Sequence, residues 1–251
     1  MKLIILCIMI VVYLQADSAD ICIEVPSNSQ KKPLGKIIKI DGKAKVLSAD
    51  SIKKHKACLE EKLFSGDSLI SYADARVLVE LSDMSKIILD SESQLSFMTS
   101  DSLRQDSGEV YYRIEQRGVL KGLQVETPFS IIGIKGTEFI VNARKSGEIA
   151  LNEGLIGVAS LQADFELHKK EVMAEYEAYK QKQEQGFENF KSQGSKVIVE
   201  YVKSFELSQN KRLQFNEKSK CKEECEAKVD ELDFNIGTKN RFTSYQEMLE
   251  K

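Results

Sequence analysis

The sequence predicts a mainly β fold, of the roll, solenoid or sandwich type, followed by a C-terminal helical region with a short β-hairpin. Two observations lead to this prediction. Between residues 35 and 160, short apolar runs alternate with polar residues and are separated by turn residues at regular intervals. After Leu161 the composition changes to proline-free segments rich in Glu, Lys, Gln and Ala, which are strong helix formers.

The overall composition describes an ordinary globular chain. Its 251 residues allow one large domain or a domain with an appendage. Hydrophobic residues make up 42% and charged residues 30%, and the net charge of −3 argues against a dedicated nucleic-acid binder. Only two histidines occur, which leaves few of the usual routes to acid–base or metal chemistry.

Residues 1–19 have the layout of a secretory signal peptide. Lys2 precedes an apolar run from Leu3 to Leu14, and small residues follow at Ala16 and Ala19. The run is shorter than the roughly 20 residues that span a bilayer, so an uncleaved anchor or a buried strand is the lesser alternative. We expect an exported protein, periplasmic or secreted, with no transmembrane helix after cleavage.

Export makes the cysteines candidates for disulfides. Removal of the signal peptide with Cys7 leaves Cys22, Cys58, Cys221 and Cys225, and an even number in an oxidising compartment favours pairing. Four cysteines allow three pairings, and their positions favour Cys22–Cys58 and Cys221–Cys225. Zinc binding by the last two would require two further ligands, so no metal or cofactor is predicted.

A polar linker at residues 20–34 leads into the β region of residues 35–160. Asp41-Gly42 lies between two strand-like runs and predicts a hairpin, because both residues tolerate a positive φ. Lysines are frequent from residue 31 to 56, which is either a cationic face for anionic envelope polymers or a solvated strand surface. We expect further strands near residues 67–71, 75–81, 86–90, 91–98, 109–116, 123–126, 148–152 and 155–160. In the strand at 109–116, alternation places Val110, Tyr112 and Ile114 inward and Tyr111, Arg113 and Glu115 outward.

The stretch from Val125 to Val141 is the centre of this β region. Thr127-Pro128 forces an extended entry, because proline excludes the preceding residue from the helical region. A short β-branched run then continues to Ile134, and glycines at 133 and 136 favour a tight turn or bulge. A strand restarts at Phe139.

The C-terminal appendage is expected to span residues 161–251. The segments 161–193 and 218–232 have the composition and apolar spacing of helices, and Val197–Lys203 is also helix-like. Ser204–Leu207 and Leu213–Phe215 flank a polar turn and predict a hairpin around 204–216. Residues 235–238 should end the second helix, and residues 243–251 should add one or two helical turns.

Several motifs resemble the FecR domain, a family named for the ferric-citrate regulator. The blocks V-E-T-P and G-I-K-G-T-E-F-I-V resemble its last motif, and G-D-S-L-I with A-D-A-R-V resembles its first. The family has glycine where Met84 stands. The residues that the resemblance marks as structural are Gly66, Asp67, Gly108, Thr127, Pro128, Gly133, Gly136, Thr137 and Phe139. Regulators of this family join the domain to a transmembrane helix and a sigma-factor-binding segment.

No catalytic motif accompanies these features. There is no nucleophile elbow, phosphate-binding glycine loop or H-E-x-x-H motif. We therefore expect a non-enzymatic protein that binds or scaffolds an envelope protein or polymer. The first alternative is a periplasmic signalling component of a sigma/anti-sigma system. An envelope enzyme is the third reading, and it requires a pocket that contains Glu138 or His168.

Overall fold

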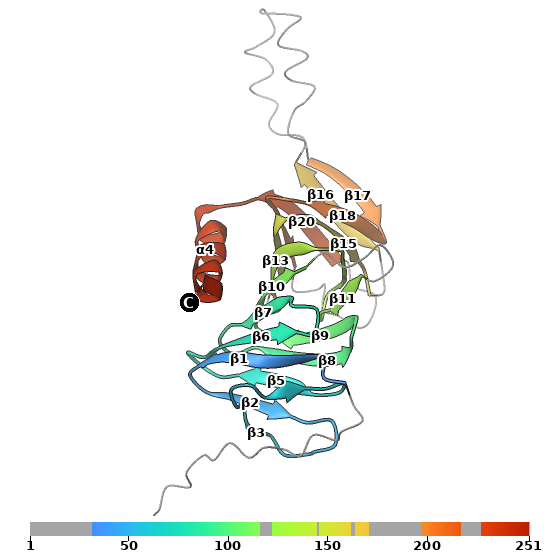
Figure 1. Ribbon diagram of the computed structural model, residues 1–251. Helices are drawn as coiled ribbons and strands as arrows, with labels where there is room; N and C mark the ends of the chain where they lie inside the picture. The colour runs from blue at the N-terminus through green and yellow to red at the C-terminus, as the bar shows by residue number, and fades with distance from the viewer. Residues whose placement is uncertain are drawn as a thin grey trace, which may run out of the picture.

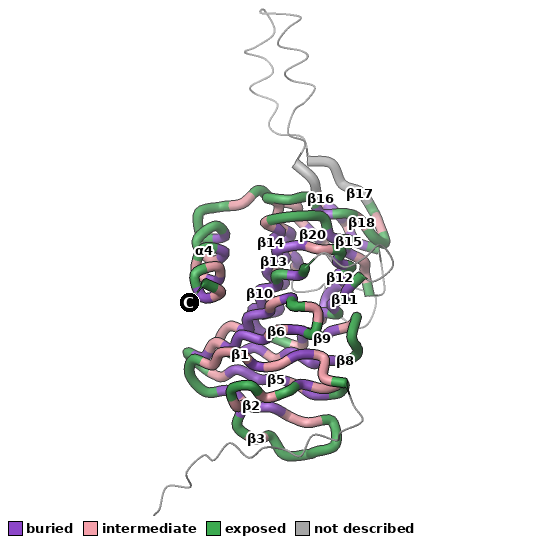
Figure 2. Tube along the Cα trace, viewed as in Figure 1, coloured by how far each residue is buried: buried purple, intermediate pink, exposed green. Residues whose placement is uncertain are grey.

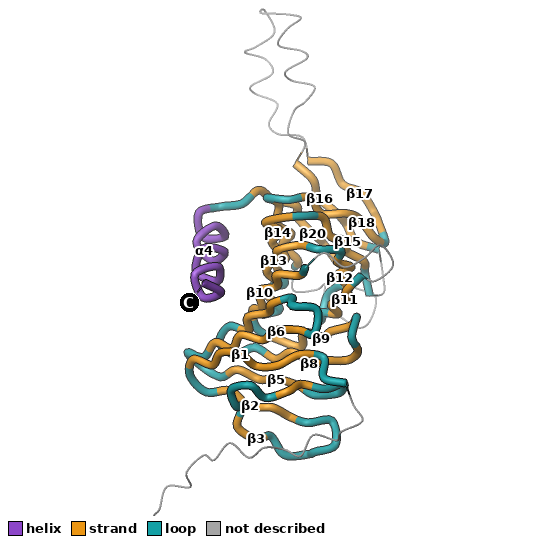
Figure 3. The backbone as a smooth tube through the Cα atoms, in the orientation of Figure 1, coloured by secondary structure: helices purple, strands orange, loops and turns teal. Residues whose placement is uncertain are grey.

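A computed structural model describes residues 32–115, 122–144, 146–161, 164–170, 197–216 and 227–250. These residues form two large β-sheets and one C-terminal helix, α4 (Ile236–Glu250) (Figures 1 and 3). The mainly β fold with a C-terminal helical part is therefore confirmed. The predicted signal peptide and most of the linker at residues 20–34 lie outside the described residues.

The first sheet has eleven strands and carries α4 on its outer face. Its strands, in spatial order, are β17 (Val197–Val202), β16 (Phe165–Lys170), β20 (Ala227–Asp233), β19 (Lys211–Phe215), β14 (Glu148–Glu153), β13 (Thr137–Asn142), β10 (Glu109–Ile114), β7 (Lys86–Leu89), β6 (Arg76–Leu81), β1 (Gly35–Asp41) and β4 (Lys62–Leu63). All neighbours pair antiparallel except β16 and β20, which are parallel.

The second sheet has nine strands. In spatial order they are β18 (Ser204–Ser208), β15 (Leu155–Ala159), β12 (Ile131–Ile134), β11 (Leu123–Glu126), β9 (Ser102–Ser107), β8 (Gln94–Thr99), β5 (Ser68–Ser71), β2 (Ala44–Leu47) and β3 (His55–Lys56). Here β9 and β11 form the parallel pair.

The main core lies between the two sheets, since one apolar cluster contains residues of both (Figure 2). Ile37 and Val77 enter it from the first sheet, and Leu69 and Leu95 from the second. The alternation read from the sequence of β10 is confirmed for this face, because Val110, Tyr112 and Ile114 all join the cluster.

Two predicted hairpins have the right strands but different pairing. Gly42 has the expected positive φ of 83°, yet β1 pairs with β4 and β6 whereas β2 pairs with β3 and β5 of the other sheet. Likewise, the strands of the segment 204–216 separate, because β18 pairs with β15 and β19 pairs with β14 and β20. At each of these turns the chain crosses from one sheet to the other.

The C-terminal segments show where helix propensity is overridden. The predicted helix 161–193 contains β16 and otherwise lies largely outside the described residues. Residues 197–203 and the end of the segment 218–232 are also strands, β17 and β20. Phe165, Leu167 and Val229 are fully buried in the core, and that burial outweighs a propensity difference of less than about 1 kcal/mol per residue.

Residues 235–238 also differ from the prediction, since they begin a helix instead of ending one. The Asn235 side chain accepts hydrogen bonds from the Thr238 backbone N–H (2.8 Å) and hydroxyl (3.0 Å), as an N-cap does. Among the described residues, no helix has both the length and the apolar character required to cross a membrane.

Met84 adopts a left-handed backbone conformation, which glycine adopts more readily than any other residue. Its φ is +69° and its side chain is 72% exposed. Left-handed geometry costs an L-residue about 1 kcal/mol or more, and glycine avoids most of that cost. We expect Met84→Gly to raise the free energy of unfolding by about 0.5–1 kcal/mol in urea denaturation. Ser82→Gly, in the same turn, is the control and should give no gain.

Candidate functional site

Helix α4 lies on the outer face of the eleven-stranded sheet, on the side opposite the main core (Figure 1). Phe242, Tyr245 and Met248 are buried, and their spacing of three residues places them on one side of the helix. These three residues were not predicted to form a functional set. Their spacing is the signal that could have identified the buried face of the helix.

A row of apolar residues crosses the sheet beneath α4. Its members are cross-strand neighbours, one from each of the five strands β6, β7, β10, β13 and β14: Leu78, Ile88, Tyr111, Ile140 and Ala150. All five are buried in one cluster with the helix. The Tyr111 ring lies 5.3 Å from the Tyr245 ring and 6.2 Å from the Phe242 ring, between centroids. We call these five residues the apolar row.

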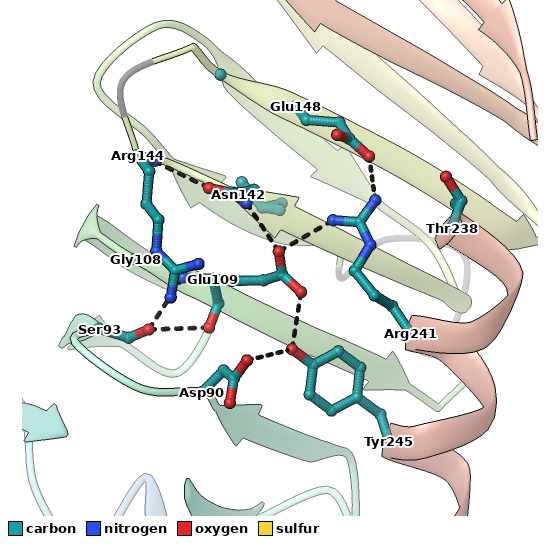
Figure 4. A network of polar contacts seen from close by, with 12 residues as sticks. Asp90, Ser93, Gly108, Glu109, Asn142, Arg144, Glu148, Thr238, Arg241 and Tyr245 are labelled. Carbon is teal, nitrogen blue, oxygen red and sulfur yellow. Dashed lines mark hydrogen bonds and ion pairs between the residues drawn. The ribbon is translucent and has the colours of Figure 1, made fainter. Parts of the chain in front are cut away.

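Glu109 is the centre of a polar border along one side of the apolar row (Figure 4). Its side chain is only 4% exposed. The carboxylate accepts hydrogen bonds from Asn142 Nδ2 (2.8 Å), Arg241 Nη1 (2.9 Å) and the Tyr245 hydroxyl (2.8 Å). Arg241 also pairs with Glu148 on β14. One buried carboxylate therefore joins two strands of the sheet to two residues of the helix.

Asp90 and Arg76 extend this border. The Tyr245 hydroxyl is 3.0 Å from Asp90 Oδ2, and Arg76 Nε donates to Asp90 Oδ1 at 2.9 Å. Arg76 also lies over the Tyr245 ring and donates to Ser244 Oγ at 3.1 Å. Since a phenol carries one proton, Tyr245 donates to one of the two carboxylates at a time.

A second polar border lies on the other side of the apolar row. Glu138 is buried and accepts hydrogen bonds from the Tyr111 hydroxyl (2.8 Å), Asn152 Nδ2 (3.2 Å) and Gln246 Nε2 (2.7 Å). The apolar row and its two borders together form the surface that we call the docking face. Its chemistry suits recognition of an amphipathic helix.

Contact between the docking face and α4 changes the pKa values of groups on both. Burial, followed by the nearby charges of Glu109 and Asp90, raises the pKa of Tyr245 well above its usual value. Burial and the hydrogen bond to Glu138 raise the pKa of Tyr111 in the same way. For Arg241 burial alone would lower the pKa, but the charges of Glu109 and Glu148 reverse this and the pKa is raised.

Alkaline pH is therefore expected to weaken the docking of α4. For Tyr111 and Tyr245, the pKa in the folded protein is higher than the pKa of about 10 in the unfolded chain. Their contribution to the free energy of unfolding is therefore complete below about pH 10 and decreases as the pH rises above it. The free energy of unfolding should fall by about 1.4 kcal/mol per pH unit for each tyrosine above about pH 10. Tyr245→Phe should show a shallower fall in urea denaturation at pH 8–11. Equal slopes in both proteins would contradict this assignment.

The predicted motif residues are distributed through the fold and do not meet at one site. Gly66, Gly108 and Gly136 have positive φ values of 91°, 82° and 110°, as tight turns require. The buried Asp67 carboxylate accepts from the backbone N–H groups of Phe64 (2.8 Å) and Ala49 (3.0 Å). Gly108 is the motif residue adjacent to Glu109.

The remaining motif residues support the stretch between β11 and β13. Thr127 Oγ1 accepts from the Ser130 N–H at 2.9 Å, and Pro128 lies in this turn. Gly133 faces Gly157 across β12 and β15, and Thr137 begins β13. Phe139 is fully buried and stacks on Tyr112 with 4.7 Å between ring centroids.

The two residues named for the enzyme alternative have other partners. Glu138 belongs to the docking face, and His168 on β16 pairs with Glu166 at 2.7 Å. Within the described ranges, no group of three or more His, Cys, Asp or Glu side chains is arranged to hold a metal ion. Cys22, Cys221 and Cys225 lie outside these ranges. The pairings Cys22–Cys58 and Cys221–Cys225 therefore remain predictions.

Comparisons with known proteins identify the β region. Residues 67–157 match the family model described as FecR protein. No curated protein matches the chain. Two crystal structures, at 2.50 Å and 1.65 Å resolution, of a candidate anti-sigma factor from Parabacteroides distasonis ATCC 8503 are similar at 12% sequence identity and a TM-score of 0.44. Each match covers 70% of this chain, which spans only 63% and 64% of the two matched chains.

Proposed function

We propose that this protein is a signalling component of a cell-surface regulatory system, because residues 67–157 match the FecR family model. It would bind a second envelope protein and relay the state of that protein. The family match carries this proposal. It supports the signalling role, which the sequence analysis gave as the alternative, better than the role of a scaffold for an envelope polymer.

The proposal includes export. The apolar run of residues 3–14 supports cleavage after Ala16 or Ala19, which would place the mature protein in the periplasm or outside the cell. The disulfide bonding of Cys58 supports export, and Cys22 is the partner that we propose for it. An oxidising compartment would favour such a bond.

The proposed activity is binding and not catalysis. Glu109 is a buried carboxylate whose partners are Asn142 on β13 and Arg241 and Tyr245 of α4, and Arg241 also pairs with Glu148. Such an arrangement supports a role in holding protein segments together. It is consistent with a regulator that works through contacts.

Crosslinking in intact cells, followed by identification of the crosslinked protein, tests this function. We expect one envelope protein to be captured and the mature chain to begin after Ala16 or Ala19 by N-terminal sequencing. Deletion of the chain should change transcription of a defined set of genes. Association with the cell-wall polymer alone, with transcription unchanged, would favour the scaffold instead. An intact Met1 would show that residues 3–14 act as an anchor.

A further inference from the structure

The docking face and the helix that covers it come from different parts of the chain. The apolar row, Glu109 and Glu138 all lie within the segment 67–157 that matches the FecR family. Helix α4 lies outside that segment. It is joined to β20 only through Phe234 and Asn235. The FecR domain thus supplies a complete helix-binding surface, and a separate segment occupies it.

The docking face requires an occupant of a particular chemistry. Without a helix, the apolar row would be open to water, and such a contiguous apolar surface favours association. The borders contribute four carboxylates, from Asp90, Glu109, Glu138 and Glu148, whereas Arg76 is the basic residue that bonds within them. A suitable occupant is therefore apolar on one side and basic along the edge of that side.

Helix α4 shows how these requirements are met. Arg241 and Tyr245, four residues apart, both reach Glu109, while Phe242, Tyr245 and Met248 cover the apolar row. Four of the fifteen helix residues are buried, and Ile236 at the first position is 78% exposed. Another helix with the same pattern could make every one of these contacts.

We propose that α4 is an exchangeable occupant of the docking face, and that the signalling partner displaces it with an amphipathic helix of its own. That helix carries an arginine and a tyrosine four residues apart beside an apolar stripe. Displacement frees α4 and reports that the partner is bound. This inference rests on the proposed function only for the existence of a protein partner.

Tethering explains how the exchange is regulated. A short tether gives α4 an effective concentration in the millimolar range, so a free helix of equal quality competes poorly with it. The apparent affinity of the partner helix is reduced by the fraction of molecules whose docking face is free. Any change that weakens α4 should therefore raise the affinity of the full chain for an added helix.

The test uses the full mature chain and a fluorescent synthetic peptide with the sequence of residues 234–250. Arg241→Glu in the protein repels α4 from Glu109 and leaves the docking face unchanged. We expect this variant to bind the peptide at least tenfold more tightly than the wild-type protein does. A peptide with both Arg241→Glu and Tyr245→Ala should bind at least tenfold more weakly than the natural peptide.

Hydrogen exchange provides an independent reading of α4. Amides of residues 236–250 should exchange at least tenfold faster in Arg241→Glu, and added natural peptide should speed their exchange in the wild-type protein. Phe242→Asn, which removes an apolar contact from the helix side, is the second variant if α4 of Arg241→Glu stays protected. Its effects should have the same directions.

Three results would overturn the proposal. The first is that the wild-type protein and a variant whose α4 exchanges faster bind the peptide equally well. The second is that the natural and the doubly substituted peptides bind equally well. The third is that the hydrogen exchange of α4 is unchanged in both variants. The experiment needs no cellular partner. If the peptide binds as expected but crosslinking captures no envelope protein, the proposed function fails and the docking face stands.

Discussion

Phe139→Ala is expected to lower the free energy of unfolding by about 3–5 kcal/mol, the largest effect among our predictions. Phe139 has no exposed surface, and its ring stacks on Tyr112, its cross-strand neighbour on β10. On its other side it is paired with Leu151 of β14. Alanine would leave a cavity at the centre of the main core, where neighbours from several strands cannot all move to fill it.

Urea denaturation, followed by circular dichroism, measures this loss. Phe139→Leu is the matched control, since it keeps most of the buried apolar volume and should cost less than about 1.5 kcal/mol. A loss below about 1 kcal/mol for Phe139→Ala would mean that the core around the G-T-E-F motif is loosely packed. It would also remove the reason for treating that motif as structural.

The strands of the FecR region could be predicted because their signal is local. In β10, Val110, Tyr112 and Ile114 alternate with residues of the other face, and the structure confirms which face enters the main core. However, Tyr111 is also buried, beneath α4. The alternation predicts that Tyr111 faces away from the main core, and this is correct. What covers that outer face depends on a segment more than 120 residues later in the sequence.

Pairing between strands was less predictable than the strands themselves. Gly42 permits the turn that the sequence indicates, but the positive φ does not determine whether β1 and β2 share a sheet. The same holds for β18 and β19. In β16 and β20, charged helix formers alternate with Phe165, Leu167 and Val229, and a core supplied by distant strands decides the outcome.

The docking face could not be predicted from the sequence either, because it too depends on residues that are far apart in the chain. Glu109 is an unremarkable first residue of a strand until Asn142, 33 residues away, and Arg241, 132 residues away, are placed beside it. Each contact of its carboxylate is with another side chain, so no backbone pattern or turn residue predicts it. The motif residues, in contrast, could be identified because turns and bulges constrain their own backbone.

Removal of the Glu109 carboxylate is the prediction that most directly tests the docking face. Glu109→Ala leaves Arg241, Asn142 and Tyr245 without a shared acceptor beneath the helix. Loss of one partner from a buried charge pair costs about 3–5 kcal/mol, and we expect about 3 kcal/mol here because Arg241 keeps its pairing with Glu148. The exposed Glu126→Ala, on the other sheet, is the control and should change the free energy of unfolding by less than about 0.5 kcal/mol.

The part of the protein that is destabilised by Glu109→Ala distinguishes an exchangeable α4 from an α4 that is an integral part of the fold. If α4 is exchangeable, Glu109→Ala should speed hydrogen exchange in residues 236–250 more than in β6 or β13, because the helix leaves before the sheets unfold. Glu109→Gln keeps an acceptor for Tyr245 or Arg241 and should lie between Glu109→Ala and the wild-type protein. If exchange instead rises equally in the helix and in both strands, α4 and the FecR domain unfold as one unit. In that case, the outer face of the sheet is a second core and not a binding surface.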